Sequence, residues 1–251
     1  MVFKRPDSDN ECSHGELLGT KRVHTAMKKK NAFKPASSLA LFFLATLVAQ
    51  SALSTPTEDD VPLDDFADAS LEGWSERSFE GNTHYELVEE DGVRVLKGHT
   101  RQQASILYKT TEIDLNETPV VNWSWKVDRT YVNINELARE GDDFPARLYV
   151  VAKVGFLPWE TLAINYVWAS ELPVGETWSN PFTDKAKMVA VQSGDAHVGQ
   201  WTSHSRNIAE DFENLFGQTI DEIDGYAVMV DGDNSQAEAV AWFAQIDFTA
   251  N

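Results

Sequence analysis

The chain of 251 residues contains one cysteine, Cys12, which lies far ahead of the segments with strand patterns. A single thiol cannot form an intramolecular disulfide, and a zinc site needs several cysteines or histidines at short spacing. The histidines beyond residue 54 (His84, His99, His197 and His204) form no H-x-H or H-E-x-x-H pattern. The sequence also lacks a G-x-S-x-G elbow, a P-loop and a dinucleotide fingerprint. Cysteine and zinc chemistry and these enzyme classes therefore have no support.

Basic residues are scarce, because 21 lysines and arginines face 40 acidic residues and leave a net charge of −19. Residues 1–54 hold eight of the basic and four of the acidic residues, so the remainder of the chain carries about −23. A surface this negative repels nucleic acid and anionic lipid. Neither is expected as a partner.

Long hydrophobic runs are also absent. The apolar run at residues 39–49 has about 11 residues, whereas a membrane-spanning helix needs roughly 20. Lysines at 28–30 and 34 precede this run and small residues follow it, which is the layout of a secretory signal peptide. We expect a signal peptide at 27–54, cleaved after Ser51 or Ser54, with a membrane anchor as the alternative. Residues 1–26 are then a mis-assigned or disordered leader. The mature protein is expected to be exported to the periplasm or the medium, with no membrane insertion.

The remaining chain is predicted to be an acidic linker at 55–65, which contains Pro56 and Pro62, and a single domain at 66–250. Short runs rich in β-branched and aromatic residues predict strands, and Asp91-Gly92 predicts a hairpin turn between two of them. The runs are 85–88, 93–97, 105–108, 112–115, 120–127, 148–154, 161–168, 188–193, 226–231 and 240–248. Loops are expected at 129–141, 173–182 and 194–205.

Alternation predicts which face of each strand is buried. In 120–127, Val121, Trp123, Trp125 and Val127 share one face, and two indoles there imply a thick core between packed layers. In 148–154, the apolar positions are even-numbered, and Arg147, Tyr149 and Lys153 face the opposite way. In 161–168, the residues on one face are Ile164, Tyr166 and Trp168, with Asn165 opposite. In the last run, Val240, Trp242, Ala244, Ile246 and Phe248 are expected on one face.

One helix is predicted near 207–216. Asn207 and Glu210 form a capping box, Ile208, Phe212, Leu215 and Phe216 follow a helical spacing, and Gly217 is a typical stop. About ten short strands with one helix favour an all-β fold, a two-layer antiparallel β-sandwich of jelly-roll (galactose-binding-like) type.

The domain resembles a bacterial family defined only as a domain of unknown function, numbered 3047. The likeness rests on Trp123-Ser-Trp125-Lys-Val127, on residues 142–150 (DDFPARLYV), on residues 165–168 (NYVW), on residues 180–183 (NPFT) and on residues 229–234 (MVDGDN). The resemblance implies an exported bacterial protein and no particular activity. The opening at 66–74 separately resembles the first strand of carbohydrate-binding jelly rolls.

Two polar clusters are candidate sites. Asp231, Asp233 and Ser235 place side-chain oxygens at positions i, i+2 and i+4, as in the start of a calcium loop, but the later glutamate of an EF-hand is not at its required spacing. A hydrogen-bonded turn, a site for a structural Ca²⁺ and a ligand site are the alternatives, and no other cofactor is expected. Asp143 and Arg147 are the second cluster, next to Asp142. They form either a clamp for a ligand or a salt bridge that fixes the loop to the sheet.

Aromatic residues in predicted loops are the third candidate. Trp159, Trp178 and Trp201 either stack on a sugar ring or fold back over the edge of the core. By contrast, Arg206, Asn207 and Asp211 are expected to be structural, around the helix start. The candidate ligand-binding residues are therefore Asp143, Arg147, Asn165, Trp178, Trp201, Asp231 and Asn234.

Three functions remain open. The preferred hypothesis is a non-catalytic, carbohydrate-binding-like domain that takes a glycan or another small ligand. The alternatives are a polysaccharide hydrolase or lyase that uses Asp143, Arg147, His204 and Asp231, and a structural protein of the cell envelope.

Overall fold

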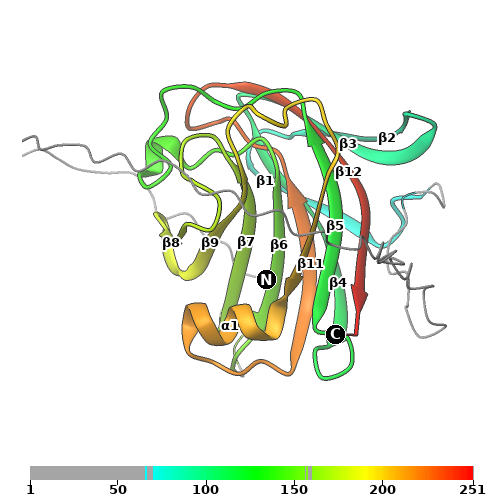
Figure 1. Ribbon diagram of the computed structural model, residues 1–251, viewed down its shortest axis with the longest axis vertical. Coiled ribbons are helices and arrows are strands. Elements are labelled where there is room, and N and C mark those ends of the chain that lie inside the picture. The colour runs from blue at the N-terminus through cyan, green and yellow to red at the C-terminus, as the bar shows by residue number, and fades with distance from the viewer. Residues whose placement is uncertain (1–65, 67–69, 156, 158–159, 251) are drawn as a thin grey trace, which may run out of the picture. The chain divides into compact units, whose positions relative to one another are not determined.

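Two β-sheets packed face to face make up the part of the chain that the computed structural model describes, which is Phe66, 70–155, 157 and 160–250 (Figure 1). The seven-stranded sheet has the order β1 (Trp74–Glu80), β4 (Ala104–Asp114), β11 (Glu222–Met229), β6 (Arg147–Lys153), β7 (Thr161–Ala169), β9 (Thr183–Ser193), β8 (Thr177–Asn180). The five-stranded sheet has the order β10 (Thr202–Asn207), β5 (Val120–Val127), β12 (Glu238–Thr249), β3 (Val93–Arg101), β2 (His84–Glu90). Paired strands are antiparallel except β7 and β9, which run parallel. The predicted two-layer β-sandwich is confirmed. The expected signal peptide and linker lie outside the described residues.

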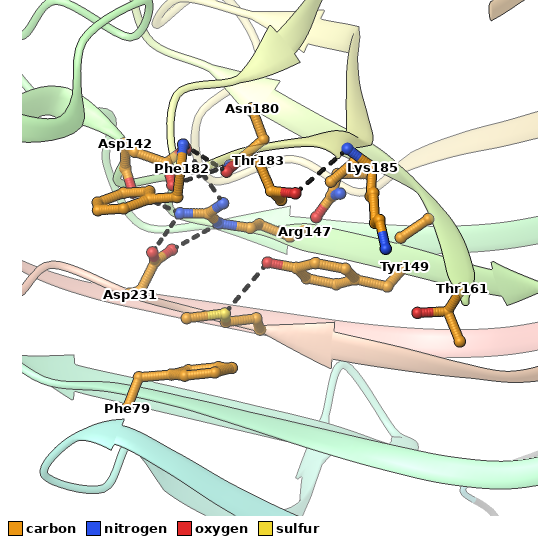
Figure 2. Close-up of a pocket in the computed structure, with 14 residues that line it drawn as sticks. Phe79, Asp142, Arg147, Tyr149, Thr161, Asn180, Phe182, Thr183, Lys185 and Asp231 are labelled. Carbon is orange, nitrogen blue, oxygen red and sulfur yellow. Dashed lines mark hydrogen bonds and ion pairs between the residues drawn. The ribbon is translucent and has the colours of Figure 1, made fainter. Parts of the chain in front are cut away.

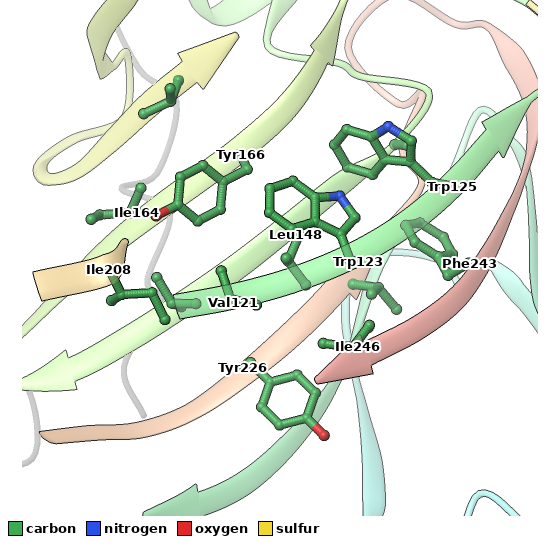
Figure 3. Packing of buried hydrophobic residues seen from close by; sticks show 14 of the residues in the cluster. Val121, Trp123, Trp125, Leu148, Ile164, Tyr166, Ile208, Tyr226, Phe243 and Ile246 are labelled. Atoms are coloured by element: carbon green, nitrogen blue, oxygen red, sulfur yellow. The ribbon is translucent and has the colours of Figure 1, made fainter. Parts of the chain in front are cut away.

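The core lies between the sheets, where the alternation predicted it. Trp123 and Trp125 of β5 point inward and meet the rings of β7, with a centroid distance of 5.3 Å from Trp123 to Tyr166 (Figure 3). Leu148, Val150 and Ala152 of β6 face the same core. Burying this much aromatic and branched surface is the main force that holds the two layers together.

The helix α1 (Ile208–Phe216) follows β10 directly, and Ile208 and Phe212 are buried in the core. The Asn207 side chain accepts a hydrogen bond from the Glu210 backbone N–H at 3.1 Å, and Gly217 ends the helix with φ +65°. The predicted helix and its caps are confirmed.

The predicted face of the last strand is wrong in its first half. In β12, Ala239, Ala241 and Phe243 face the core instead of Val240, Trp242 and Ala244, while Ile246 and Phe248 are buried as expected. A β-bulge between Ala244 and Ile246 causes the change, because Gln245 adopts φ +49° and shifts the register by one residue. A prediction from strict alternation assumes that no residue is inserted in the strand, so it cannot anticipate the bulge.

Several boundaries also differ from the prediction. The first strand, β1, had no predicted counterpart, and β4 is continuous where two runs were expected. Part of the expected loop at 173–182 is strand β8, and the expected loop at 194–205 ends where β10 begins at Thr202. The loop at 129–141 is irregular, as expected, with a short 3₁₀ helix at Arg139–Gly141. Within the described residues, none of the helices has the length and apolar character to cross a lipid bilayer.

The bulge at Gln245 gives a test of the β12 register. A left-handed backbone is unfavourable for a side chain with a Cβ, so Gln245→Gly is expected to raise the free energy of unfolding by about 0.5–1 kcal/mol. Urea unfolding followed by tryptophan fluorescence measures this. The matched control is Ala244→Gly, which lies next to the bulge outside the positive-φ positions and should lower stability by a similar amount. A loss of stability in both variants would contradict the bulge.

Candidate functional site

The outer face of the seven-stranded sheet carries the residues that alternate with the core positions. Tyr149 and Arg147 of β6, Asn165 of β7 and Met229 of β11 all point away from the core. They line a pocket of about 120 Å³ on this face (Figure 2). The two central strands β6 and β7 are thus buried on both sides, which is why they contain so few polar residues.

A buried ion pair forms one end of the pocket. The Arg147 Nε donates to Asp231 Oδ1 at 2.8 Å, and its Nη2 donates to Asp231 Oδ2, so the pair is bidentate. Arg147 is 2% exposed and Asp231 is fully buried. Burial alone would lower the pKa of the Arg147 guanidinium, but Asp231, Tyr149 and Asp142 raise it well above its usual range. Arg147 is therefore a permanent cation inside the protein.

The same ion pair holds the loops beside the pocket. Asp231 Oδ1 accepts a hydrogen bond from the Phe144 backbone N–H at 3.2 Å, and Arg147 Nη1 reaches Asp142 Oδ1 at 3.5 Å. Asp142 Oδ2 in turn accepts from Asn180 Nδ2 at 3.0 Å. Buried polar groups linked in this way fix the geometry of a site. Arg147 thus lines the pocket and also has the structural role given as the alternative.

Asn165 is the unusual residue of the pocket. Asn165 is 1% exposed, and neither its Oδ1 nor its Nδ2 has a hydrogen-bond partner among the residues that the structure describes. Leaving a buried polar group unpaired costs about 1–3 kcal/mol. A lone asparagine in an apolar strand is therefore expensive for the fold, and its amide lies in the wall of the pocket with its hydrogen-bonding capacity unused.

Tyr149 and two phenylalanines supply the apolar walls. The Tyr149 hydroxyl donates to the sulfur of Met229 at 3.3 Å, and burial raises the pKa of Tyr149, so the phenol stays protonated at neutral pH. Phe79 of β1 and Phe182 after β8 line the pocket with it. Neither phenylalanine was a predicted site residue. Strand β1, which contains Phe79, was not predicted, and Phe182 was noted only as part of the sequence Asn180-Pro181-Phe182-Thr183 that supports the family resemblance.

Asp143 and Asn234 lie beside the pocket and do not line it. Asp143 Oδ1 accepts hydrogen bonds from the Asn234 backbone N–H at 3.3 Å and from Asn234 Nδ2 at 3.0 Å, and Oδ2 accepts from the Ser235 N–H. Asp143 thereby fixes the turn that follows Asp231, as expected for a hydrogen-bonded turn. Asp143, Asp231 and Asp233 offer carboxylate oxygens within 4.8 Å of one another. A structural calcium ion at these oxygens is the alternative that the EDTA and Ca²⁺ comparison below tests.

The two described loop tryptophans lie elsewhere. Trp178 sits in β8 and packs against Phe144 with a centroid distance of 6.1 Å, so it covers the edge of the outer face. Trp201 lies just before β10, in the other sheet, and its Nε1 donates to Asp91 Oδ2 at 3.2 Å. Lys126 lies 5.2 Å from the Trp201 ring centroid. Trp159 is outside the described residues.

His204 is also remote from this pocket. It lies on β10 with its ring 5.2 Å from Trp123, and its Nε2 accepts a hydrogen bond from Trp125 Nε1 at 3.0 Å. Burial lowers the pKa of His204 to about 4, so the ring is neutral at neutral pH. The proposed catalytic set of Asp143, Arg147, His204 and Asp231 is therefore divided between the two sheets.

The family comparison agrees with the resemblance seen in the sequence. The model of the family described as "Protein of unknown function (DUF3047)" matches residues 72–247. No curated protein matches the sequence.

Solved structures that are similar to this chain include three carbohydrate-binding modules. TmCBM61 in complex with β-1,4-galactotriose is 10% identical with a TM-score of 0.38, and the alignment covers 74% of this chain and 94% of the module. CBM28, specific for non-crystalline cellulose, is 12% identical with a TM-score of 0.39, covering 78% and 98%. The CBM22-2 xylan-binding domain of Paenibacillus barcinonensis Xyn10C is 12% identical with a TM-score of 0.32, covering 74% and 97%. Similarity at this level transfers no binding property to this chain.

Removing the cation of the buried pair tests its role. Arg147→Met leaves the carboxylate of Asp231 buried without its counter-charge, and it is expected to lower the free energy of unfolding by about 3–5 kcal/mol. The double variant Arg147→Met with Asp231→Asn should be more stable than Arg147→Met alone, because the second change removes the uncompensated charge. Urea unfolding of the unmodified protein, of each single variant (Arg147→Met and Asp231→Asn) and of the double variant measures the coupling, and strictly additive losses would contradict it.

The control for this pair is Arg206→Met. Arg206 pairs with Asp211, but its side chain is 40% exposed and Asp211 keeps a hydrogen bond from the Tyr166 hydroxyl at 2.7 Å. Water screens this pair, so the expected loss is about 1 kcal/mol or less.

The carboxylate cluster is tested by adding or removing calcium. The oxygens of Asp143 and Asp231 already accept hydrogen bonds from Arg147 and from backbone N–H groups. Because these donors replace a cation, we expect the melting temperature in excess EDTA and in millimolar Ca²⁺ to agree within about 1 °C, with Mg²⁺ as the control for ionic strength. Binding to the folded state alone would raise the melting temperature. A rise specific to Ca²⁺ would establish the ion site instead.

Proposed function

The chain belongs to the DUF3047 family, and we propose that the pocket on the outer face of its seven-stranded sheet binds a carbohydrate without converting it. The unpaired amide of Asn165 is the observation that carries this proposal. An amide offers an acceptor oxygen and donor hydrogens side by side. Neighbouring hydroxyls of a sugar ring, each both donor and acceptor, satisfy the two at once.

The walls of the pocket suit the apolar face of the same ring. Phe79, Phe182 and Tyr149 present aromatic surface, and Ala163 and Ala186 leave room between them. Ligand pockets commonly combine such apolar walls with a few fixed polar groups. Sugars match this combination because their C–H face is apolar and their edge is polar.

The volume limits the size of the ligand. About 120 Å³ is well below the roughly 300–1,000 Å³ of pockets for drug-sized molecules. The pocket therefore suits one sugar unit, either free or at the end of a chain. A long polymer would have to lie mostly outside it.

The carboxylates of the pocket support binding without catalysis. Glycoside hydrolysis requires two carboxyl groups on opposite sides of the scissile bond. Asp142 and Asp231 both line the pocket, but both are hydrogen-bonded to the same guanidinium of Arg147. Neither is placed as an independent acid or nucleophile. An exported location, which the expected signal peptide would give, suits a protein that meets extracellular glycans.

Replacing Asn165 with leucine separates function from stability. Leucine has a similar shape and no polar atoms, so Asn165→Leu is expected to raise the free energy of unfolding of the ligand-free protein by about 1–2 kcal/mol. The same change should abolish sugar binding. Chemical denaturation measures the first effect, and a glycan array followed by calorimetry with the sugars it identifies measures the second.

The matched control is Asn122→Leu on β5. Asn122 is half-buried, and its Nδ2 donates to Asp247 Oδ2 at 3.3 Å and to Thr249 Oγ1 at 3.0 Å. Its replacement removes satisfied hydrogen bonds and should destabilise the fold while leaving sugar binding intact. The proposal fails if no sugar binds to the unmodified protein, or if binding survives Asn165→Leu. Release of reducing ends or of unsaturated sugars from a bound glycan would show that the site is catalytic.

A further inference from the structure

We propose that Arg139 is a positioning residue for the sugar pocket, which holds the ring of Phe182 in the pocket wall without contacting the ligand itself. The inference rests on the proposed carbohydrate site and adds a residue on which the affinity of that site depends. It comes from the contacts between the loop at 129–141 and the turn that follows β8.

The turn that carries Phe182 lies at the edge of the seven-stranded sheet. Strand β8 has four residues and ends the strand order, where its described neighbour is β9 alone. The register of this pairing shifts between Ser179 and Asn180, just before the turn. Phe182 follows in the turn and lines the pocket (Figure 2). Because a short edge strand with an interrupted ladder is less well fixed than a central strand, this part of the pocket wall needs support from outside the sheet.

Arg139 contacts the turn at two points. Its Nε donates a hydrogen bond to the Pro181 backbone oxygen at 3.1 Å, and its Cζ lies 5.2 Å from the centroid of the Phe182 ring. A guanidinium at this distance is attracted to the aromatic ring. One side chain thus restrains both the backbone of the turn and the ring. Arg139 is not among the described residues that line the pocket, so it acts on a ligand through Phe182.

The loop that carries Arg139 is itself fixed. Glu136 is 1% exposed and accepts hydrogen bonds from the backbone N–H groups of Ser170 at 2.6 Å and Leu172 at 2.9 Å. Gly141 packs so closely that a Cβ at this position would clash with a backbone oxygen of the same loop. Arg139 lies between these two anchors, at the start of the short 3₁₀ helix. A loop fixed in this way can hold the pocket wall before a ligand arrives, which lowers the cost of binding.

Replacing Arg139 with methionine removes both contacts and keeps an unbranched side chain. Because the Phe182 ring is then less restrained, the affinity for a neutral sugar is expected to fall about three- to fivefold, the size of one exposed cation–π contact. Calorimetry with a sugar identified by the glycan array measures the affinity. Arg139 is exposed, so urea unfolding should show almost unchanged stability.

The matched control is Arg129→Met in the same loop. Arg129 is also exposed, and its Nε donates to the neighbouring Asp128 Oδ2 at 2.9 Å. The change in net charge is the same as in Arg139→Met, while the contacts to the turn after β8 are kept. This variant should retain the affinity of the unmodified protein.

A second background tests whether Arg139 acts through the ring. In Phe182→Leu there is no aromatic ring to hold, so adding Arg139→Met should have little further effect on the affinity. An effect of Arg139 on folding alone would instead give the same loss in both backgrounds. Aromatic ¹H–¹³C spectra of the ligand-free protein test the contact directly. The Phe182 resonances, assigned by their loss in Phe182→Leu, should shift in Arg139→Met and stay unchanged in Arg129→Met.

The outcomes separate the two proposals. Sugar binding that is lost in Asn165→Leu but unchanged in Arg139→Met would overturn the role of Arg139 and leave the carbohydrate site standing. Equal losses of affinity in both backgrounds, or unchanged Phe182 resonances in Arg139→Met, would also overturn it. Failure of every sugar to bind the unmodified protein would overturn the carbohydrate site and, with it, the role of Arg139 in binding.

Discussion

The buried pair of Arg147 and Asp231 is the interaction on which the site depends. It joins the start of β6 to the segment after β11 in a buried position, and through Asp142 and Asn180 it also fixes the end of β8. Taking two charges out of water is costly, and a bidentate contact offsets the cost only when the remaining polar atoms are also satisfied. The pair therefore fixes one geometry of the pocket wall, beside which Asn165 is held with its amide unpaired.

A sheet buried on both faces explains why a pocket can exist there. One face of β6 and β7 packs against the tryptophans of β5, and the other carries small residues such as Ala163 next to the large ring of Tyr149. On such a face, small side chains next to large ones leave a hollow, so the strands themselves shape the pocket. The outer face of the five-stranded sheet has a different character. There, Lys126 forms ion pairs with Glu90 and Asp91 at the turn between β2 and β3, and its amine lies over the rings of Trp201 and Trp242.

Much of this could be predicted from local patterns. Strict alternation placed Trp123 and Trp125 inside and Asn165 outside, and the capping residues around Ile208 defined the helix. Arg147, Asn165 and Asp231 were candidates because polar residues stand out in buried strands. The tryptophans were less predictable, because an indole after a turn can equally cover a sheet edge, as Trp178 does. The bulge at Gln245 and the pocket role of Phe79 depend on the pairing of distant strands, which no local pattern contains.

The side-chain amide of Asn165 offers the most direct measurement of the central claim, that this face is a binding surface completed by a ligand. In a ¹H–¹⁵N spectrum of the labelled protein, its NH₂ resonances can be assigned by their loss in Asn165→Leu. Titration with a sugar should shift these resonances more than any other side-chain amide and slow their exchange with water, because the ligand supplies the missing hydrogen bonds. Unchanged Asn165 resonances, with shifts confined to the indole N–H of Trp201 on the other sheet, would contradict the account.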